Sequence, residues 1–351
     1  MRGTFRYANP AVIHWGPGSV AELAPELQRL GAQRILLVTT RSLLAEKKLV
    51  GAVRDQVGDR DVAVVATIGQ HAPITEVDAA ARDAVDQKVD GVVSFGGGSA
   101  IDAAKMLAVR VADSKGHTDR SLPHVAIPTT LAAAELAAGA GFTNEAGDKA
   151  GMRDARLLPA CVIYDAVLTL ATPMELWLST GIRAVDHAVE GFLADGEHPF
   201  SDVMCLAAVR RLFESLPRAK ADPKDLGVRT ENQLAAWFSF TLPGPSAGGL
   251  SHVMGKQIGA RHAIPHGVTS CLLLPHVLRF VATRQPERYA SLGEAMGGDP
   301  ADSVQALIAS LGLPQHISGY GIGERELRLA ADELAGLHLA ADLGDIYLAA
   351  L

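Results

Sequence analysis

Apolar residues in the first half of the chain follow two alternating patterns. In one pattern, apolar residues recur at helical spacing, as in Val20 to Leu30 and Glu76 to Gln87; these stretches lie between the strand-like runs of the other pattern. Runs of β-branched residues and leucines, typical of buried strands, occur at Arg34 to Thr40, Asp61 to Ile68, Gly91 to Phe95 and His124 to Pro128. Strand and helix in repetition predict a doubly wound parallel sheet, which binds ligands at the carboxyl ends of its strands.

The pattern changes after a last strand-like run, Cys161 to Tyr164. From Pro173 onward the apolar residues recur at helical spacing, as in Ala184 to Leu193, Ser201 to Leu216, Thr230 to Phe240 and Val304 to Leu311. We therefore expect an α/β domain over residues 1–164 and an all-α domain over residues 165–351. The cleft between two such domains is the expected place for chemistry.

Composition narrows the classes of partner. A chain of 351 residues with 48% hydrophobic and 20% charged residues is large enough for two globular domains. Its formal charge of −7, without a basic block, argues against nucleic acid and anionic membranes as partners. Met1 to Pro10 lacks an apolar run of signal-peptide length, and no membrane-length run follows. A cytoplasmic protein is expected.

The cysteines do not indicate a redox or metal motif. Cys161, Cys205 and Cys271 are far apart, lie in apolar surroundings and lack CxxC spacing. We expect buried free thiols.

A glycine-rich segment points to a nucleotide. Gly96, Gly97, Gly98 and Ser99 directly follow a predicted strand and directly precede a helical run. Glycines let the backbone approach a ligand, and the helix start offers N–H groups and a positive dipole end to a pyrophosphate. The spacing is not GxGxxG, so a tight turn is the alternative.

Two hydroxyls end another predicted strand. Thr129 and Thr130 lie at the same edge of the sheet and could reach phosphate or ribose oxygens. Thr-Thr at a strand end is by itself more typical of a turn or a helix cap.

Basic residues gather in the helical half. His187 is followed by His252, Lys256, His262 and His266, and the spacing of His252 and Lys256 places them on one helix face. Each histidine alone is more typical of a structural residue. Together they favour a site for metal binding or proton transfer.

Several segments in order carry a family resemblance: HWGPGSVAEL, VSFGGGSAIDAAK, IPTT, LLPACVIYDAVLT, STGIRAVDHAVEGF and SHVMGKQIGARHAIPHGVTSCLLLPHVLRF. They resemble the iron-containing alcohol dehydrogenases and, within that family, the maleylacetate reductases. The resemblance implies a Rossmann-like N-terminal domain, a helical C-terminal domain and an NAD(H) or NADP(H) cofactor. It also implies a homodimer.

The resemblance bears directly on metal binding. Metal-dependent members use one aspartate and three histidines; the histidine positions match His187, His252 and His266, whereas the aspartate position holds Arg183. The family's additional histidine is Lys256 here. The fixed positive charges of Arg183 and Lys256 disfavour the binding of a metal ion. The maleylacetate reductases, which the sequence resembles, also lack the aspartate, and they act on a dicarboxylate without a metal. We expect no metal and a small anionic organic substrate.

The resemblance also places the cofactor. It assigns cofactor binding to Gly96, Gly97, Gly98, Ser99, Asp102, Thr129, Thr130 and Thr40. Asp102 resembles the alcohol dehydrogenases more than the reductases, and the segment after Thr130 keeps only Glu135 of the usual pattern. The early strand, Arg34 to Thr40, is followed by Arg41 and not by a carboxylate that would repel a 2′-phosphate. NADPH should therefore be usable as well as NADH.

The resulting hypothesis is hydride transfer to an unsaturated or keto acid without a metal. Arg183 and Lys256 would stabilise the anion, and His252 and His187 are proton-donor candidates, with His266 as wall or second donor.

The alternatives differ in chemistry. Arg183 could instead pair with Asp186 or Glu190 and merely fill the vacated metal position. A metal-dependent alcohol dehydrogenase could use a rearranged Asp186 with the histidines. A lyase on a dehydroquinate-synthase-like fold and a paralogue that only binds nucleotide are the remaining hypotheses.

Overall fold

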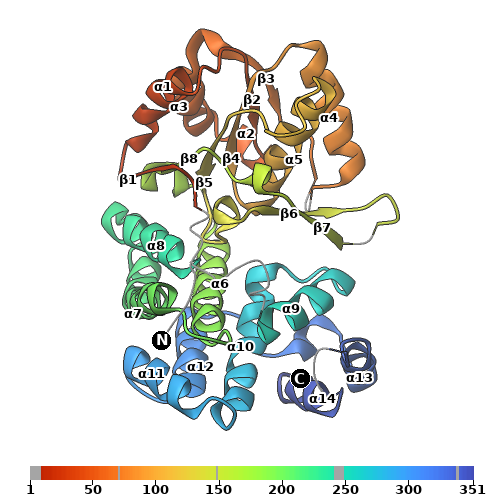
Figure 1. Cartoon of the computed structure of the whole chain (residues 1–351). Helices are drawn as coiled ribbons and strands as arrows, with labels where there is room; N and C mark the ends of the chain where they lie inside the picture. Colours follow the sequence, from red (N-terminus) through yellow and green to blue (C-terminus); the bar gives the residue numbers. More distant parts are fainter. Residues whose placement is uncertain (1–8, 70–71, 148, 241–248, 337–339) are drawn as a thin grey trace. The chain divides into compact units, whose positions relative to one another are not determined.

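The computed structural model describes residues 9–69, 72–147, 149–240, 249–336 and 340–351, which form two compact units (Figure 1). As far as it is described, the α/β unit comprises residues 9–172 together with Lys224–Leu234. The helical unit comprises Pro173–Pro223 together with Ala235–Leu351. Residues 165–172 thus lie with the α/β unit, and helix α8, Leu226–Ser239, has residues in both.

A six-stranded parallel sheet forms the centre of the α/β unit. Its strand order is β1-β8-β5-β4-β2-β3. The strands are β1 Val12–Trp15, β2 Ile35–Val38, β3 Asp61–Val65, β4 Gly91–Gly96, β5 His124–Pro128 and β8 Cys161–Tyr164. The four inner strands are buried along their whole length, as the continuous apolar runs predicted. The order reverses between β2 and β4, which is where open α/β sheets bind ligands.

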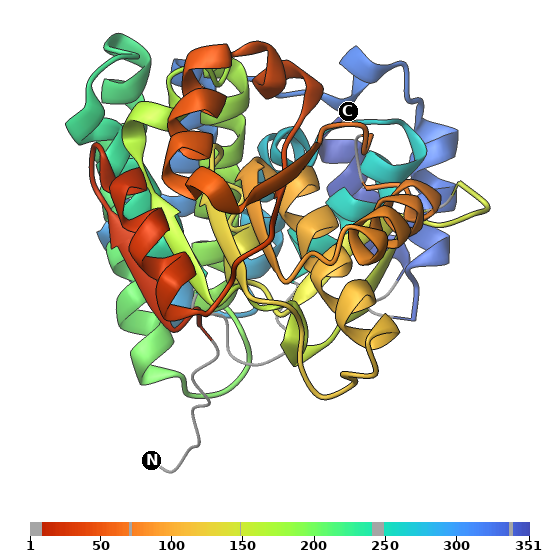
Figure 2. The same ribbon diagram turned by 90° about the horizontal axis from the view of Figure 1, so that it is seen from above.

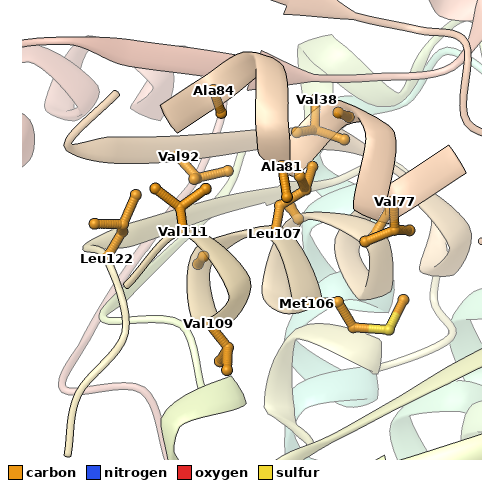
Figure 3. Close-up of a cluster of buried hydrophobic side chains, with 14 of the residues drawn as sticks. Val38, Val77, Ala81, Ala84, Val92, Met106, Leu107, Val109, Val111 and Leu122 are labelled. Carbon is orange, nitrogen blue, oxygen red and sulfur yellow. The ribbon is translucent and has the colours of Figure 1, made fainter. Parts of the chain in front are cut away.

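Helices cover both faces of this sheet (Figure 2). Helices α1, Leu23–Arg29, and α3, Lys47–Val57, bury leucines and valines against one face. Helices α4, Ile74–Asp86, and α5, Gly98–Ser114, do so on the other, where Val77 and Leu107 join the cluster around Val92 (Figure 3). Shorter pieces are α2 Arg41–Ala45 and the 3₁₀ turns Ser19–Glu22, Gly58–Arg60, Ala134–Leu136, Ala155–Leu157 and Ala166–Thr169.

Two features of this unit were not predicted from the hydrophobic pattern. Strand β1 is an edge strand, paired only with β8 among the described residues, and it is too short and too exposed to show a buried run. The antiparallel hairpin of β6, Gly139–Thr143, and β7, Lys149–Arg153, is only partly buried and contains glycines, so its strand signal is weak.

The described part of the helical unit contains helices and one 3₁₀ turn, as predicted. Helix α6, Met174–Phe192, is buried almost throughout. The others are α7 Pro199–Ala221, α9 Leu250–Arg261, α10 His266–Ala282, α11 Pro286–Met296, α12 Pro300–Leu311, the turn Ile317–Tyr320, α13 Glu324–Glu333 and α14 Ala340–Ala349.

Two smaller expectations can be compared with the structure. The three cysteines are buried and form no disulfide, as expected. None of the helices in the described ranges has both the length and the apolar content needed to cross a lipid bilayer. Most of the Met1 to Pro10 segment lies outside the described residues.

Candidate active site

The carboxyl ends of β2, β4 and β5 form one edge of the sheet, and hydrogen bonds connect them. The Thr39 hydroxyl donates to the Phe95 carbonyl over 2.7 Å. The Thr129 amide donates to the Gly96 carbonyl over 3.0 Å. The strand ends that carry Thr40, the glycine segment and the two threonines are therefore held together, as their positions in the sequence predicted.

The glycine segment fits a phosphate group. A Cβ on Gly97 would lie 3.0 Å from the Thr130 Cγ2, so glycine allows the two loops to approach closely without displacing the Thr130 side chain. Gly97 is the N-cap of α5 and has no side chain to cap the first amides of this 17-residue helix. A helix start without a side-chain cap, with the positive dipole end, suits a pyrophosphate. Of the assigned cofactor residues, Gly97, Gly98 and Ser99 lie at this helix start.

The other assigned cofactor residues also make contacts within the chain. Thr129 and Thr130 are buried. The Thr40 hydroxyl caps α2 by accepting from the Leu43 amide at 3.3 Å. Asp102 lies in the second turn of α5, and its Oδ2 accepts from the Gly141 amide at 3.0 Å, which connects α5 to the β6–β7 hairpin.

A buried lysine that sequence reasoning missed supports this edge. The Lys105 ammonium donates to the carbonyls of Ala137 and Gly139 at 2.9 and 2.8 Å, and also to the carbonyl of Ala134. Its Nζ lies 3.4 Å from Asp102 Oδ1. Burial lowers the pKa of Lys105, and the charge of Asp102 opposes that change. The Asp102–Lys105 spacing of one helical turn was the available signal.

In the helical unit, one face of α6 carries the ionisable residues of the predicted site. Arg183, Asp186, His187 and Glu190 recur at helical spacing and are buried. Helix α9 adds His252 and Lys256, and α10 begins at His266. Within this unit the structure brings Arg183, His187 and His252 together, and the charge of His266 acts on both His187 and His252 and lowers their pKa values.

Arg183 is the centre of this cluster. Its Nη1 donates to Asp186 Oδ2 at 3.1 Å and to the Ser270 hydroxyl at 2.9 Å. Its Nη2 contacts Nδ1 of His252, and the His252 Nε2 lies 3.2 Å away. Arg183 thus pairs with Asp186, as one alternative held, and at the same time contacts a histidine of the proposed site.

Two serines that sequence reasoning missed donate hydrogen bonds to Asp186. The hydroxyls of Ser270 and Ser251 donate to Asp186 Oδ2 at 2.6 and 3.1 Å. Burial raises the pKa of Asp186, and Arg183 with the two hydroxyls opposes that rise. Ser251 directly precedes His252, and Ser270 lies one turn after His266, so both could have been found by their spacing.

Close helix packing holds the histidines beside α6. A Cβ on Gly267 would lie 2.7 Å from the Ser179 carbonyl oxygen, so glycine allows α10 to approach the α6 backbone. His266, the first residue of α10, is fixed by this contact. The His187 ring packs edge-on against Phe240 with centroids 5.0 Å apart, and its centroid lies 6.1 Å from that of His252.

Burial and neighbouring charge keep two of the histidines neutral. Burial, and then the charge of Arg183, lower the pKa of His187 and of His252 well below the ordinary range. A guanidinium has only hydrogen-bond donors, so the ring nitrogen of His252 to which Arg183 donates is an acceptor.

Lys256 and Glu190 differ in exposure. Lys256 is exposed on α9, one turn after His252. Glu190 is buried, and burial with the neighbouring Asp186 raises its pKa well above the ordinary range. Its Oε1 accepts from the His252 amide at 3.2 Å.

The three histidines with Arg183 do not fit a divalent cation. The Arg183 guanidinium contacts the ring nitrogens of His252, so a fixed positive charge lies where those nitrogens would bind an ion. Asp186 Oδ2 accepts from Arg183, Ser251 and Ser270, whereas its buried Oδ1 has no hydrogen-bond partner among the described residues.

Comparison with known proteins identifies the family of the chain. The sequence profile of the iron-containing alcohol dehydrogenases matches residues 10–166, and that of the C-terminal part of the same family matches residues 177–340. A maleylacetate reductase of Sphingobium indicum is 32% identical, with 92% of this chain and 88% of that protein covered. A maleylacetate reductase of Pseudomonas aeruginosa is also 32% identical, with 93% of this chain and 89% of that protein covered.

A solved structure shows the same fold. The crystal structure of maleylacetate reductase from Agrobacterium tumefaciens superposes with a TM-score of 0.88 at 29% identity, covering 100% of this chain and 99% of that one. The chain belongs to the iron-containing alcohol dehydrogenase family and is an NAD(P)-dependent oxidoreductase similar to the maleylacetate reductases.

Proposed function

We propose that the protein reduces an unsaturated or keto dicarboxylic acid with NADH or NADPH and without a metal ion. The observation that carries this proposal is the guanidinium of Arg183 at the ring of His252, where metal-dependent relatives are expected to place an aspartate. The bound nicotinamide cofactor supplies a hydride, and one proton completes the addition to the double bond. Maleylacetate is the first substrate to test, because the relatives at about a third identity carry it in their names.

The chain's cations take different roles in this proposal. Lys256 is exposed, so its ammonium is available to bind a substrate carboxylate by a charge-assisted hydrogen bond. Arg183 is buried and bonded to Asp186, so it chiefly orients His252 and adds positive potential. Positive potential stabilises the enolate or alkoxide charge that develops during the transfer.

His252 is the favoured proton donor among the histidines. Arg183 lies against both of its ring nitrogens and so fixes the position of the ring. Its lowered pKa makes the neutral ring the resting form at pH 7, and a bound anion would raise that pKa by offsetting the charges of Arg183 and Lys256. His187 and His266 would form the wall beside it.

The glycine segment and the ends of β2 and β5 would hold the cofactor. The N-terminus of α5, with its positive dipole end, would bind the pyrophosphate, and Arg41, exposed in α2, would tolerate a 2′-phosphate. A cytoplasmic location and a homodimer remain part of the proposal.

The decisive experiment measures NADH and NADPH oxidation with maleylacetate on chelator-treated protein, with elemental analysis of the untreated sample. Turnover by metal-free protein supports the proposal. Stoichiometric iron or zinc with activity on simple alcohols would instead identify a metal-dependent alcohol dehydrogenase. Substrate conversion without net NADH loss would identify a lyase.

A matched pair of lysine variants tests the carboxylate contact. Lys256→Gln should raise the KM for the acid by roughly 10-fold, because one charge-assisted hydrogen bond is lost. Lys220→Gln changes another exposed lysine, which bonds to the Ser310 carbonyl, and should leave the KM unchanged. Equal KM values for the two variants would remove Lys256 from the site.

A further inference from the structure

Three side chains with metal-binding atoms meet in the α/β unit, on elements that the proposed reaction does not use. His14 lies on β1, Glu26 on α1 and Cys161 on β8. Their potential ligand atoms all lie within 4.8 Å of one another. Parallel pairing of β1 with β8 places Val12 opposite Cys161, and α1 covers the same face.

The chemistry of the three groups is that of a borderline-soft divalent cation. Imidazole nitrogen, carboxylate oxygen and thiolate sulfur are the ligands that Zn²⁺ takes, whereas Mg²⁺ and Ca²⁺ prefer oxygen alone. One pair is already near the spacing of two ligands on one ion, with His14 Nε2 3.1 Å from Glu26 Oε1. Three protein ligands leave one tetrahedral position for water.

We propose that His14, Glu26 and Cys161 form a binding site for a thiophilic divalent cation of the zinc type. Glu26 and Cys161 are buried and supply a preformed floor. The His14 side chain is 26% exposed and supplies the entry path. This site is distinct from the Arg183 cluster, which belongs to the helical unit.

The charges in the site account for its resting state. Burial would raise the pKa of Glu26, but the bonds from Arg29 and His14 outweigh it and hold that pKa below its usual range. Burial raises the pKa of the Cys161 thiol to about 12. A metal ion therefore binds by displacing the thiol proton to solvent, and it takes two negative ligands and one neutral imidazole.

Arg29 is the competitor of the metal ion. Its Nη2 lies 2.6 Å from Glu26 Oε2, while His14 contacts Oε1, so one carboxylate oxygen stays directed at the other two ligands. The guanidinium charge opposes the arrival of a second cation. Removal of Arg29 should therefore strengthen metal binding, whereas removal of a ligand should weaken it.

The test is a titration of the full, reduced, metal-free chain with Co²⁺, followed by displacement with Zn²⁺. Binding should produce one thiolate-to-cobalt charge-transfer band per chain, and Zn²⁺ should abolish it. Cys161→Ser should lose the band, and Cys205→Ser, which changes another buried thiol, should keep it. No band in wild type, or a band that survives Cys161→Ser, overturns the proposal.

Three further variants sharpen the titration. His14→Ala should weaken Zn²⁺ binding by roughly 100-fold, the upper end of what loss of even an outer partner costs. Arg29→Gln should strengthen it, and this sign distinguishes a ligand set from a merely structural ion pair. His252→Ala should leave the band intact. A band that depends on His252 and not on His14 would assign the cobalt to the helical unit and overturn the proposal.

Discussion

Each unit of the molecule contains a deeply buried cation, and the two cations are held in different ways. In the α/β unit, Lys105 donates to three backbone carbonyls and pairs with Asp102. In the helical unit, Arg183 donates instead to side chains, namely those of Asp186, Ser270 and His252. Lys105 therefore fixes the backbone, whereas Arg183 connects groups that can change their protonation.

The difference separates support from chemistry. Lys105 joins α5 to the segment before the hairpin and so stabilises the edge that carries the glycine segment. Arg183 orients a histidine and lowers its pKa. Loss of Lys105 should therefore be felt mainly in stability, and loss of Arg183 in stability and turnover together.

The largest effect is expected for Arg183→Leu. It leaves Asp186 buried without its partner, which should cost about 3–5 kcal/mol of unfolding free energy. It should also lower kcat/KM by about 100-fold, since His252 loses its orientation. Urea unfolding and steady-state kinetics measure the two effects.

The double variant Arg183→Leu with Asp186→Leu is the control for that experiment. It removes both charges, so most of the stability should return while activity stays low. Recovery of activity in the double variant would show that Arg183 only compensates Asp186.

A smaller effect on stability alone is expected for Lys105→Met. Loss of charge-assisted bonds to the carbonyls and to Asp102 should cost about 2–3 kcal/mol. Because the cation touches no proposed reacting group, kcat at saturating substrate and cofactor should change less than threefold, which is about 0.6 kcal/mol. A kcat loss as large as that of Arg183→Leu would abolish the distinction between the two cations.

A pH effect of about 2 kcal/mol is expected next, at His124 in the α/β unit. Burial, and then the charge of Lys105, lower the pKa of His124 from 6.5 to about 3. As the pH falls below 6.5, the unfolded chain takes up a proton that the folded chain does not, so stability is full above pH 6.5 and is lost toward pH 3. From pH 6.5 to 5.0 the wild type should lose about 2 kcal/mol more than His124→Asn.

His252 provides the corresponding measurement in the helical unit. Its pKa is also lowered, so the comparison of wild type with His252→Asn should have the same sign. Chemical denaturation at a series of pH values gives both differences. The difference in unfolding free energy between wild type and variant could prove independent of pH for His124→Asn and steeply dependent on pH for His252→Asn. That result would place the buried positive potential in the helical unit alone.

The smallest effect concerns cofactor choice. Arg41→Glu should raise the KM for NADPH relative to NADH by about 10-fold, or about 1.4 kcal/mol, because a carboxylate would repel the 2′-phosphate. Arg82→Glu changes another exposed arginine of the same unit and is the matched control. Unchanged ratios in both variants would show that the 2′-phosphate is not near α2.

The sequence predicted the α/β unit best. The apolar runs of its inner strands are long and continuous because those strands are buried on both faces, and the glycine segment lies at the predicted strand-to-helix junction. The pattern missed β1 and the β6–β7 hairpin, since edge and exposed strands bury too little surface to constrain their residues.

The residue types of the candidate site were also determined by the sequence alone. Arginine in place of a carboxylate, and lysine in place of a further histidine, are chemical facts that need no coordinates. Family membership followed from the same motifs, because their order and spacing extend over nearly the whole chain.

Only the tertiary structure decided which partners those residues have. Arg183 and Asp186 are three positions apart, but Ser270 and His252, the other partners of Arg183, come from segments distant along the chain. The carbonyls that bind the Lys105 ammonium are likewise distant from it in the sequence. The same holds for His14, Glu26 and Cys161, which sequence analysis left unconnected. Spacing along one helix or strand fixes which side chains share a face, whereas contacts between elements depend on how whole faces pack, and that packing is settled by the burial of many residues at once.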